Sequence, residues 1–120
     1  MTDSTLDYSK LDQPEVLQTI FYPRREEYTS PLPSNSVDVD INVDDGVHLH
    51  ARFHLAAKEE PNILFFHGNG EIVSDYDTIG PLYTKYGMNF LAVDYRGYGR
   101  STGTPTVTSM LGDSHIILNT

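Results

Sequence analysis

The chain has 120 residues, which is enough for one domain with a modest core. Its 17 acidic residues outnumber 8 basic ones, and a net charge of −9 disfavours nucleic acid or an anionic membrane as a partner, because both attract basic surfaces. The absence of cysteine excludes a disulfide framework and thiolate chemistry. From Met1 onward the sequence shows neither a signal peptide nor an apolar segment of membrane-spanning length, so we expect a cytoplasmic protein.

The first 36 residues are polar and contain one short helical pattern. Pro14 suits a first helical position, and four apolar residues follow it at helical spacing: Val16, Leu17, Ile20 and Phe21. Residues 24–36 are rich in proline and polar side chains, which is typical of a loop. We therefore predict an N-terminal helical arm and linker over residues 1–36 and a domain over residues 37–120.

An antiparallel hairpin is predicted at the start of this domain. Apolar residues alternate with polar ones from Val37 to Val43, an Asp-Gly turn follows at residues 45–46, and the alternation resumes from Val47 to Leu55. The second strand places His48, His50, Arg52 and His54 on one side. Two histidines at this spacing can bind zinc, but a site needs three or four ligands. We interpret them as solvated strand residues and predict no metal.

A strand–helix–strand unit follows the hairpin. Ile63–Phe66 and Asn89–Val93 are continuously apolar, as expected for neighbouring parallel strands covered on both faces. Between them, apolar residues recur at intervals of three and four, which predicts an amphipathic helix over residues 71–86. Pro81 should kink or break this helix, and Gly87 should end it. A last segment from Thr104 is predicted to form a helix still running at Thr120, although Gly112 weakens that pattern.

The loop His67-Gly68-Asn69-Gly70 is the first candidate functional site. Two glycines directly after a buried strand allow a close backbone approach, so N–H groups can be aimed at a developing oxyanion. A tight turn without a ligand is the plain alternative. A dinucleotide site is another, since Asp94 ends the next strand, but Val73 stands where the third glycine of that fingerprint belongs. We therefore predict no cofactor.

The segment Gly99–Gly103 matches the pattern of a nucleophile elbow, G-x-S-x-G, only in its letters. An elbow needs a strand directly before it and a helix directly after it. Here the strand ends near Asp94, and Thr104-Pro105 follows the motif. The nearby Asp113 and His115 are two residues apart and would not face each other on a helix. We interpret Ser101 as a loop residue that is not a nucleophile.

Taken together, residues 62–114 resemble the α/β-hydrolase pattern of strand, H-G-x-G loop, helix, strand and D-x-R-G-x-G-x-S. The resemblance implies that Asn69, with its neighbour Gly70, supplies an oxyanion N–H. It also implies structural roles in shaping and anchoring the two loops for His67, Gly68, Asp94, Arg96, Gly97 and Gly99. In that family the nucleophilic serine, the acid and the catalytic histidine lie further along the chain. The implied fold is thus α/β, an incomplete N-terminal part of the hydrolase sheet.

Two functional hypotheses follow from this resemblance. In the first, the chain is the N-terminal portion of a serine hydrolase that acts on a small-molecule ester or related acyl compound once it is completed. In the second, it is a non-catalytic fragment or interaction module. The family's strand order would leave Ile63–Phe66 as an open edge, available to a partner strand or to a missing C-terminal half. Such an edge also predicts that the chain alone is poorly stable.

Overall fold

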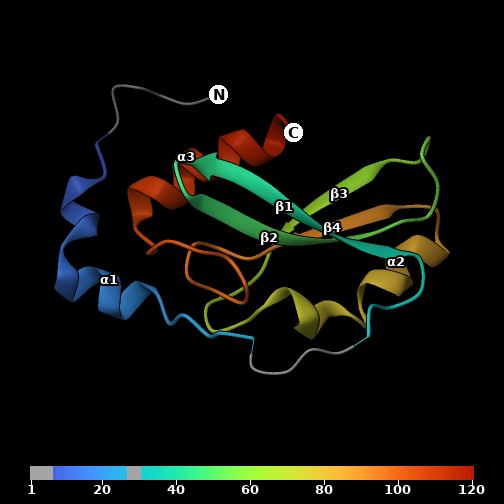
Figure 1. Cartoon of the computed structure of the whole chain (residues 1–120), viewed down its shortest axis with the longest axis horizontal. Coiled ribbons are helices and arrows are strands. Elements are labelled where there is room, and N and C mark those ends of the chain that lie inside the picture. The colour runs from blue at the N-terminus through green and yellow to red at the C-terminus, as the bar shows by residue number, and fades with distance from the viewer. Residues whose placement is uncertain (1–6, 27–30) are drawn as a thin grey trace.

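A computed structural model describes residues 7–26 and 31–120. Two parts of the chain lie outside these ranges. They are the extreme N-terminus, on which the signal-peptide expectation depends, and part of the predicted linker. The described chain forms one twisted four-stranded sheet with strand order β1-β2-β4-β3 (Figure 1). None of its helices, within the described ranges, has the length and apolar character needed to cross a bilayer.

The sheet combines an antiparallel hairpin with a parallel pair. Strands β1 (Ser36–Asp44) and β2 (Val47–His54) pair antiparallel, which confirms the predicted hairpin. Strands β3 (Asn62–Phe66) and β4 (Asn89–Val93) pair in parallel, and β4 joins the hairpin through an antiparallel pairing with β2. The predicted strand–helix–strand unit is therefore confirmed, and β3 forms an edge of the described sheet, as expected.

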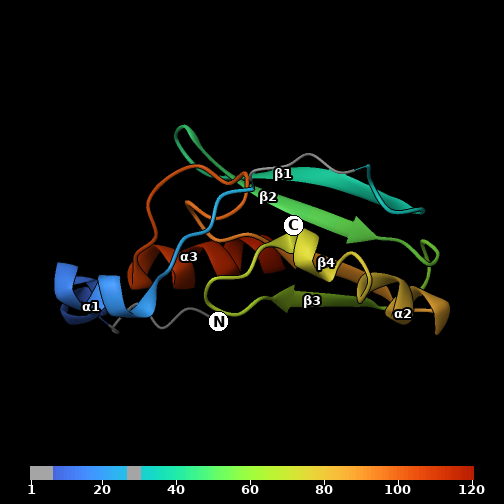
Figure 2. The same ribbon diagram turned by 90° about the horizontal axis from the view of Figure 1, so that it is seen from below.

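Short helices cover both faces of this sheet. On one face α3 (Val107–Leu118) packs on a buried cluster that comprises Ile41, Leu49, Ala51, Val93 and Ile117. On the other, the 3-10 helix η2 (Val73–Tyr76) and α2 (Gly80–Lys85) flank a cluster of Val73, Phe90 and Ala92. Burial of each large apolar side chain in these clusters contributes about 1.5–3 kcal/mol. The arm (residues 7–26) contains η1 (Ser9–Asp12) and α1 (Pro14–Ile20), which lie at the end of the molecule opposite α2 (Figures 1 and 2).

The helix predicted over residues 71–86 is broken into η2 and α2, and it begins at Val73 rather than Glu71. Pro81 lies in the first turn of α2, where its missing N–H costs nothing. Gly80 packs directly on the His54 ring, since a Cβ at that position would lie 2.4 Å from it. Gly87 adopts the expected left-handed conformation, with a φ of 76°, directly after the α2 cap.

The last helix differs from its predicted bounds. It begins at Val107, where the Thr106 side chain accepts a hydrogen bond from the Ser109 N–H as a helix cap, and it ends at Leu118 instead of continuing through Thr120. Gly112 lies inside this helix, and no atom would come within 4 Å of an added Cβ. The glycine therefore lowers helix propensity without serving a close contact.

The prediction that the strand histidines are solvated is wrong for two of the three. His50 and His54 are only 3% and 1% exposed, whereas His48 is exposed. All three alternate onto the same side of β2, as predicted, but the start of α2 covers His54, and the His50 ring lies between Asp38 and Asp94. Within the described ranges, no cluster of three or more histidine or acidic side chains could hold a metal ion.

The open β3 edge generates a first prediction. Because β3 offers unpaired backbone groups beside an exposed Phe66, we expect the 120-residue chain to self-associate and to be cut rapidly by protease. Phe66→Lys should weaken self-association by placing a charge at this edge. Leu82→Lys is the matched control, because Leu82 is more exposed than Phe66 but lies on α2. Sedimentation velocity over a concentration series measures the effect, and a protease-resistant monomer would contradict this expectation.

Candidate functional site

The loop after β3 lies at the carboxyl end of the parallel strand pair, beside the segment that follows β4. Ligands of open α/β sheets bind at this edge. Gly70 has a φ of 79°, in the left-handed region that favours glycine, and thus allows the sharp turn. The Gly68 N–H donates to Glu71 Oε1 at 2.5 Å, and the Tyr76 hydroxyl donates to the same oxygen at 2.6 Å. These donors, Tyr76 first, lower the pKa of Glu71 below its usual value.

Asn69 is held in this loop by its side chain. Its Oδ1 accepts hydrogen bonds from the Tyr22 N–H at 2.6 Å and from the Tyr98 hydroxyl at 2.8 Å. In the part of the chain that the structure describes, neither the Asn69 N–H nor the Gly70 N–H has an acceptor. The loop thus presents two backbone donors while its side-chain amide is fixed.

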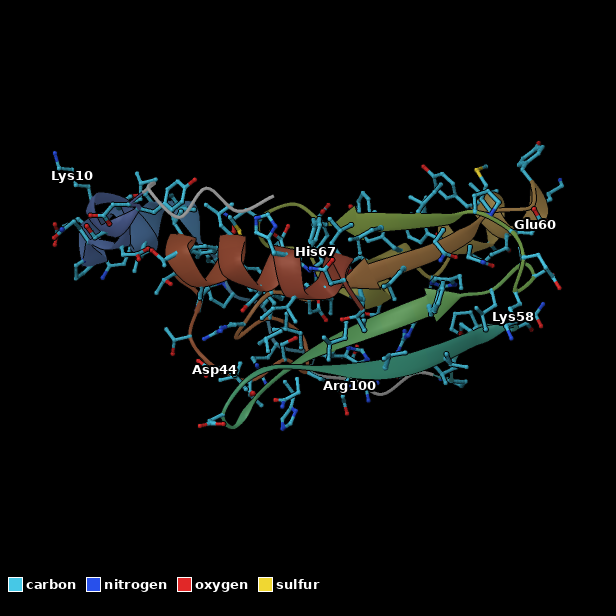
Figure 3. The ribbon with its side chains drawn as sticks, turned by 90° about the horizontal axis from the view of Figure 1, so that it is seen from above. Lys10, Asp44, Lys58, Glu60, His67 and Arg100 are labelled. Atoms are coloured by element: carbon cyan, nitrogen blue, oxygen red, sulfur yellow. The ribbon has the colours of Figure 1, made fainter. Side chains whose placement is uncertain are left out.

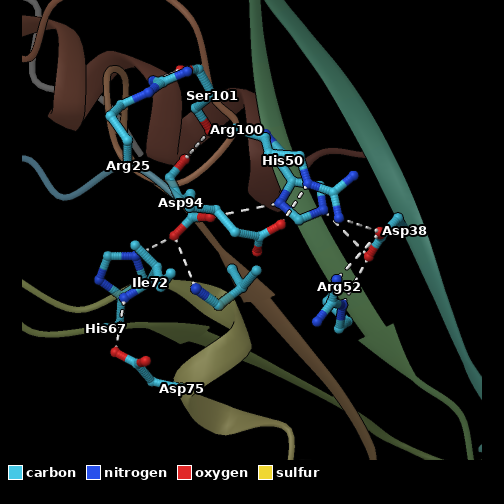
Figure 4. Close-up of polar contacts among 12 residues, drawn as sticks. Arg25, Asp38, His50, Arg52, His67, Ile72, Asp75, Asp94, Arg100 and Ser101 are labelled. Atoms are coloured by element: carbon cyan, nitrogen blue, oxygen red, sulfur yellow. Dashed lines mark hydrogen bonds and ion pairs between the residues drawn. The ribbon is translucent and has the colours of Figure 1, made fainter. Parts of the chain in front are cut away.

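Asp94 is the fully buried carboxylate that links the loop to the rest of the sheet. Its Oδ1 accepts from His67 Nε2 at 2.7 Å and from the Val73 N–H at 3.0 Å (Figure 4). The other ring nitrogen of His67 lies 2.9 Å from the Gly68 carbonyl oxygen. Both nitrogens are therefore engaged, so His67 holds the loop and has no free nitrogen to act as a base. Figure 3 shows His67 in the interior of the molecule, far from Lys10 and Glu60 at its ends.

A chain of buried and partly buried ionisable side chains continues from Asp94 across the sheet. His50 lies between two carboxylates, with Nδ1 3.5 Å from Asp94 Oδ2 and Nε2 3.2 Å from Asp38 Oδ1 (Figure 4). Arg52 donates to the same Asp38 at 2.8 Å and to Asp77 at 3.0 Å. Burial alone would lower the pKa of His50, but the contacts with Asp94 and Asp38 outweigh it and raise that pKa above 6.5.

Ser101 lies inside this network, completely buried. Its hydroxyl donates to the Asp94 carbonyl at 2.9 Å and accepts from the His50 N–H at 2.8 Å. A hydroxyl held in this way pins the loop to β2 and β4 and has no access to a substrate. The motif around Ser101 is therefore structural, in agreement with its interpretation as a loop residue.

The remaining motif residues shape the loop after β4. Arg96 donates to both carboxylate oxygens of Asp113 on α3, at 2.8 and 2.9 Å, so Asp113 is engaged with an arginine instead of a histidine. Gly97 and Gly99 have φ values of 79° and 54°. A Cβ on Gly99 would lie 2.0 Å from Asp94 Oδ2, so this glycine lets the backbone close over the buried carboxylate.

The contribution of the arm to the site was not apparent from the sequence. Arg24 donates to Asp75 in η2 at 2.6 and 2.8 Å and to the Gly70 carbonyl at 3.2 Å. The hydrogen bond from Arg24 lowers the pKa of Asp75. Residues 24–26 also run beside Gly99, whose N–H donates to the Arg24 carbonyl at 2.7 Å. These partners are separated by 46 or more residues, and no local pattern indicates such contacts.

Comparisons with known proteins identify relatives of this site and sheet. No protein-family model matches the chain. It is 28% identical to the uncharacterized protein YfhR of Salmonella typhi, over 82% of this chain and 35% of that protein. It is 34% identical to the alpha/beta hydrolase domain-containing protein WAV2 of Arabidopsis thaliana, over 68% of this chain and 28% of that protein.

A solved structure adds to these sequence relatives. The alpha-beta hydrolase from Vibrio vulnificus matches with a TM-score of 0.62 and 29% identity, over 72% of this chain and 29% of that one. The chain thus spans about a third of the length of the curated relatives it matches.

Two glycine substitutions test the packing around Asp94. Gly99→Ala forces a Cβ against the buried Asp94 carboxylate at a positive φ, so it should lower the free energy of unfolding by more than about 2 kcal/mol. Gly112→Ala, the same change in an open helical position, should raise it by about 0.5–1 kcal/mol. Urea denaturation followed by circular dichroism measures both. Equal effects of the two changes would show that the close approach to Asp94 is unimportant.

The charge chain predicts a pH-dependent stability. The pKa of His50 is raised in the folded state, so its contribution is fully present below pH 6.5 and is lost as the pH rises through the folded-state value. The free-energy difference between the wild type and His50→Asn should therefore shrink between pH 6 and 9. Burial lowers the pKa of His54, so His54 changes the stability with pH in the opposite direction. Because His54 is present in both proteins, its contribution cancels in the difference between them.

The control for this experiment is His48→Asn, at the exposed position on the same side of β2. We expect the His48 difference to stay flat over the same pH range. If the free-energy difference for His50→Asn also stayed constant over this pH range, the raised pKa of His50 would be contradicted.

Proposed function

The chain belongs to the α/β-hydrolase fold family and carries part of that fold, and on this premise we propose that it forms the oxyanion-binding portion of a serine hydrolase that acts on esters or related acyl compounds. The observation that carries the proposal is the Asn69-Gly70 turn, with two N–H groups that have no acceptor in the described chain. Fixed backbone donors of this kind stabilise the negative charge that develops on a carbonyl oxygen during acyl transfer.

The surroundings of the turn support this role. Preorganised donors are effective when their positions do not relax during the reaction. Here the Asn69 side chain is fixed by Tyr22 and Tyr98, and His67 is fixed by Asp94. In this proposal the nucleophilic serine, its histidine base and the acid come from polypeptide beyond the present 120 residues, since Ser101 is buried and fully hydrogen-bonded.

Phosphate binding at the same loop is disfavoured by the hydrogen bonding and helix geometry around it. The Gly68 N–H is occupied by the Glu71 carboxylate, so the loop lacks the row of free N–H groups that a pyrophosphate needs. The loop also leads into a four-residue 3-10 turn, so no long helix directs its N-terminus at the site. These features favour a small oxyanion over a dinucleotide.

The open β3 edge supports the second candidate, an interaction module without catalysis. The two functions differ in a direct test. A polypeptide in which this chain is continued to the length of its relatives should hydrolyse p-nitrophenyl butyrate if it is a hydrolase. An interaction module would leave the ester at its background rate of hydrolysis.

Asn69→Asp probes the oxyanion role within that longer polypeptide. The variant keeps an oxygen that can accept from Tyr22 and Tyr98, but it adds a negative charge beside the developing oxyanion. We expect kcat to fall about 10- to 100-fold with little change in KM, because the charge acts on the transition state.

Asn62→Asp is the matched control. Asn62 lies at the opposite end of β3, and its Oδ1 also accepts a side-chain hydrogen bond, from Asn89. Steady-state kinetics of both variants make the comparison. Equal kcat values for the wild type and Asn69→Asp would contradict an oxyanion role for this loop.

A further inference from the structure

A hollow of about 130 Å³ lies between the arm, the loop after β3 and the start of α3. Its lining combines apolar side chains with residues of the candidate site: Ile20, Phe21, His67, Asn69, Tyr95, Tyr98 and Met110. The hollow therefore adjoins Asn69, whose N–H has no acceptor within the described chain. Its contact with the loop that carries this donor distinguishes it from an ordinary packing defect.

The chemistry of the walls points to an apolar ligand group. Ile20, Phe21 and Met110 carry no polar side-chain atom that could bind a charged group. The hydroxyls of Tyr95 and Tyr98 are already engaged, with the His67 carbonyl and the Asn69 amide, so these residues mainly add ring surface. An apolar cavity of about 150 Å³ accommodates a benzene-sized molecule, which indicates that this hollow holds a group of roughly four to six carbons.

We propose that this hollow binds the short acyl chain of the substrate and that the N-terminal arm forms the wall that limits its length. This inference deepens the proposed function and rests on it for the acyl chemistry. A bound acyl group would place its carbonyl or carboxylate oxygen at Asn69 and its apolar chain against Ile20 and Met110. This arrangement uses both the backbone donor and the apolar walls of the hollow.

The position of the arm is fixed at two points around the hollow. On the loop side, the Tyr22 N–H donates to Asn69 Oδ1 at 2.6 Å and to the Tyr98 hydroxyl at 2.9 Å. On the helix side, Asp12 accepts from the Val107 N–H at 2.8 Å and from the Thr108 hydroxyl at 2.5 Å. An arm anchored in this way keeps Ile20 and Phe21 at a constant distance from α3, as a length-selective pocket requires.

Binding can be measured on the 120-residue chain without catalysis. The chain has three methionines, so methyl-labelled methionine gives a simple NMR spectrum in which Met110 reports on the hollow. Met88 directly precedes β4, whereas Tyr95 of the hollow follows that strand, so Met88 serves as the internal reference. We expect sodium butyrate to shift the Met110 signal and leave Met88 unchanged. Two additional buried methylene groups should make butyrate bind about tenfold tighter than acetate.

A filling variant and its control complete the test. Ile20→Phe occupies the hollow and should weaken butyrate binding about tenfold or more. Ile116→Phe makes the same change at a partly exposed position of α3 outside the hollow and should leave binding unchanged. Butyrate that leaves Met110 unshifted, or that shifts Met88 equally, overturns the pocket.

The outcomes separate this inference from the function on which it rests. Selective butyrate binding at Met110 together with an inactive longer polypeptide would support the pocket and refute the hydrolase. Ester hydrolysis by the longer polypeptide without a response at Met110 would support the hydrolase and refute the pocket. Within an active enzyme, Ile20→Phe should also shift the preference among p-nitrophenyl esters from butyrate toward acetate.

Discussion

The buried carboxylate of Asp94 is the interaction on which the arrangement of this site depends. A carboxylate with no solvent exposure is costly unless donors surround it. Here the donors come from separate parts of the chain: His67 after β3 and the backbone N–H of Val73 in η2. His50 on β2 places its Nδ1 3.5 Å from the other carboxylate oxygen. Each segment is thereby fixed relative to the end of β4, and removal of any one donor leaves a buried charge less satisfied.

This arrangement explains how a small sheet can present fixed backbone donors. The loop from His67 to Gly70 is exposed over much of its length, yet its two ends are tied to buried groups. From outside, the arm adds hydrogen bonds to Asn69 and an ion pair to Asp75. Donors held from both sides change little in position when charge develops beside them, which is the condition for electrostatic stabilisation of an oxyanion. The arm is thus part of the proposed site and not a passive extension.

Local patterns in the sequence were sufficient to predict the strands, whereas the order of the strands in the sheet came from the family resemblance. The alternation from Val37 to Leu55 predicted the hairpin, and two apolar runs predicted β3 and β4 with nearly their observed bounds. The burial of His50 and His54 could not be predicted, because alternation assigns residues to a side of a strand but does not reveal what covers that side. Pro81 predicted the break in the helix, but the requirement for glycine at position 80 was not predicted, because its contact with His54 joins residues 26 positions apart. Likewise, the loop His67–Gly70 was found by its motif, whereas its link to Tyr22 depends on the tertiary fold.

The most direct test of this account is amide hydrogen exchange in Asp94→Asn, measured residue by residue by NMR. The amide is close in size to the carboxylate but removes the negative charge that holds His67. The account predicts that exchange accelerates at Gly68 and from Glu71 to Val73, the loop amides that have acceptors, while the paired amides of β1 and β2 keep their protection. Unchanged protection of the loop would contradict the central role of Asp94. A uniform acceleration throughout the sheet would equally contradict it, because it would show that Asp94 contributes only to global stability.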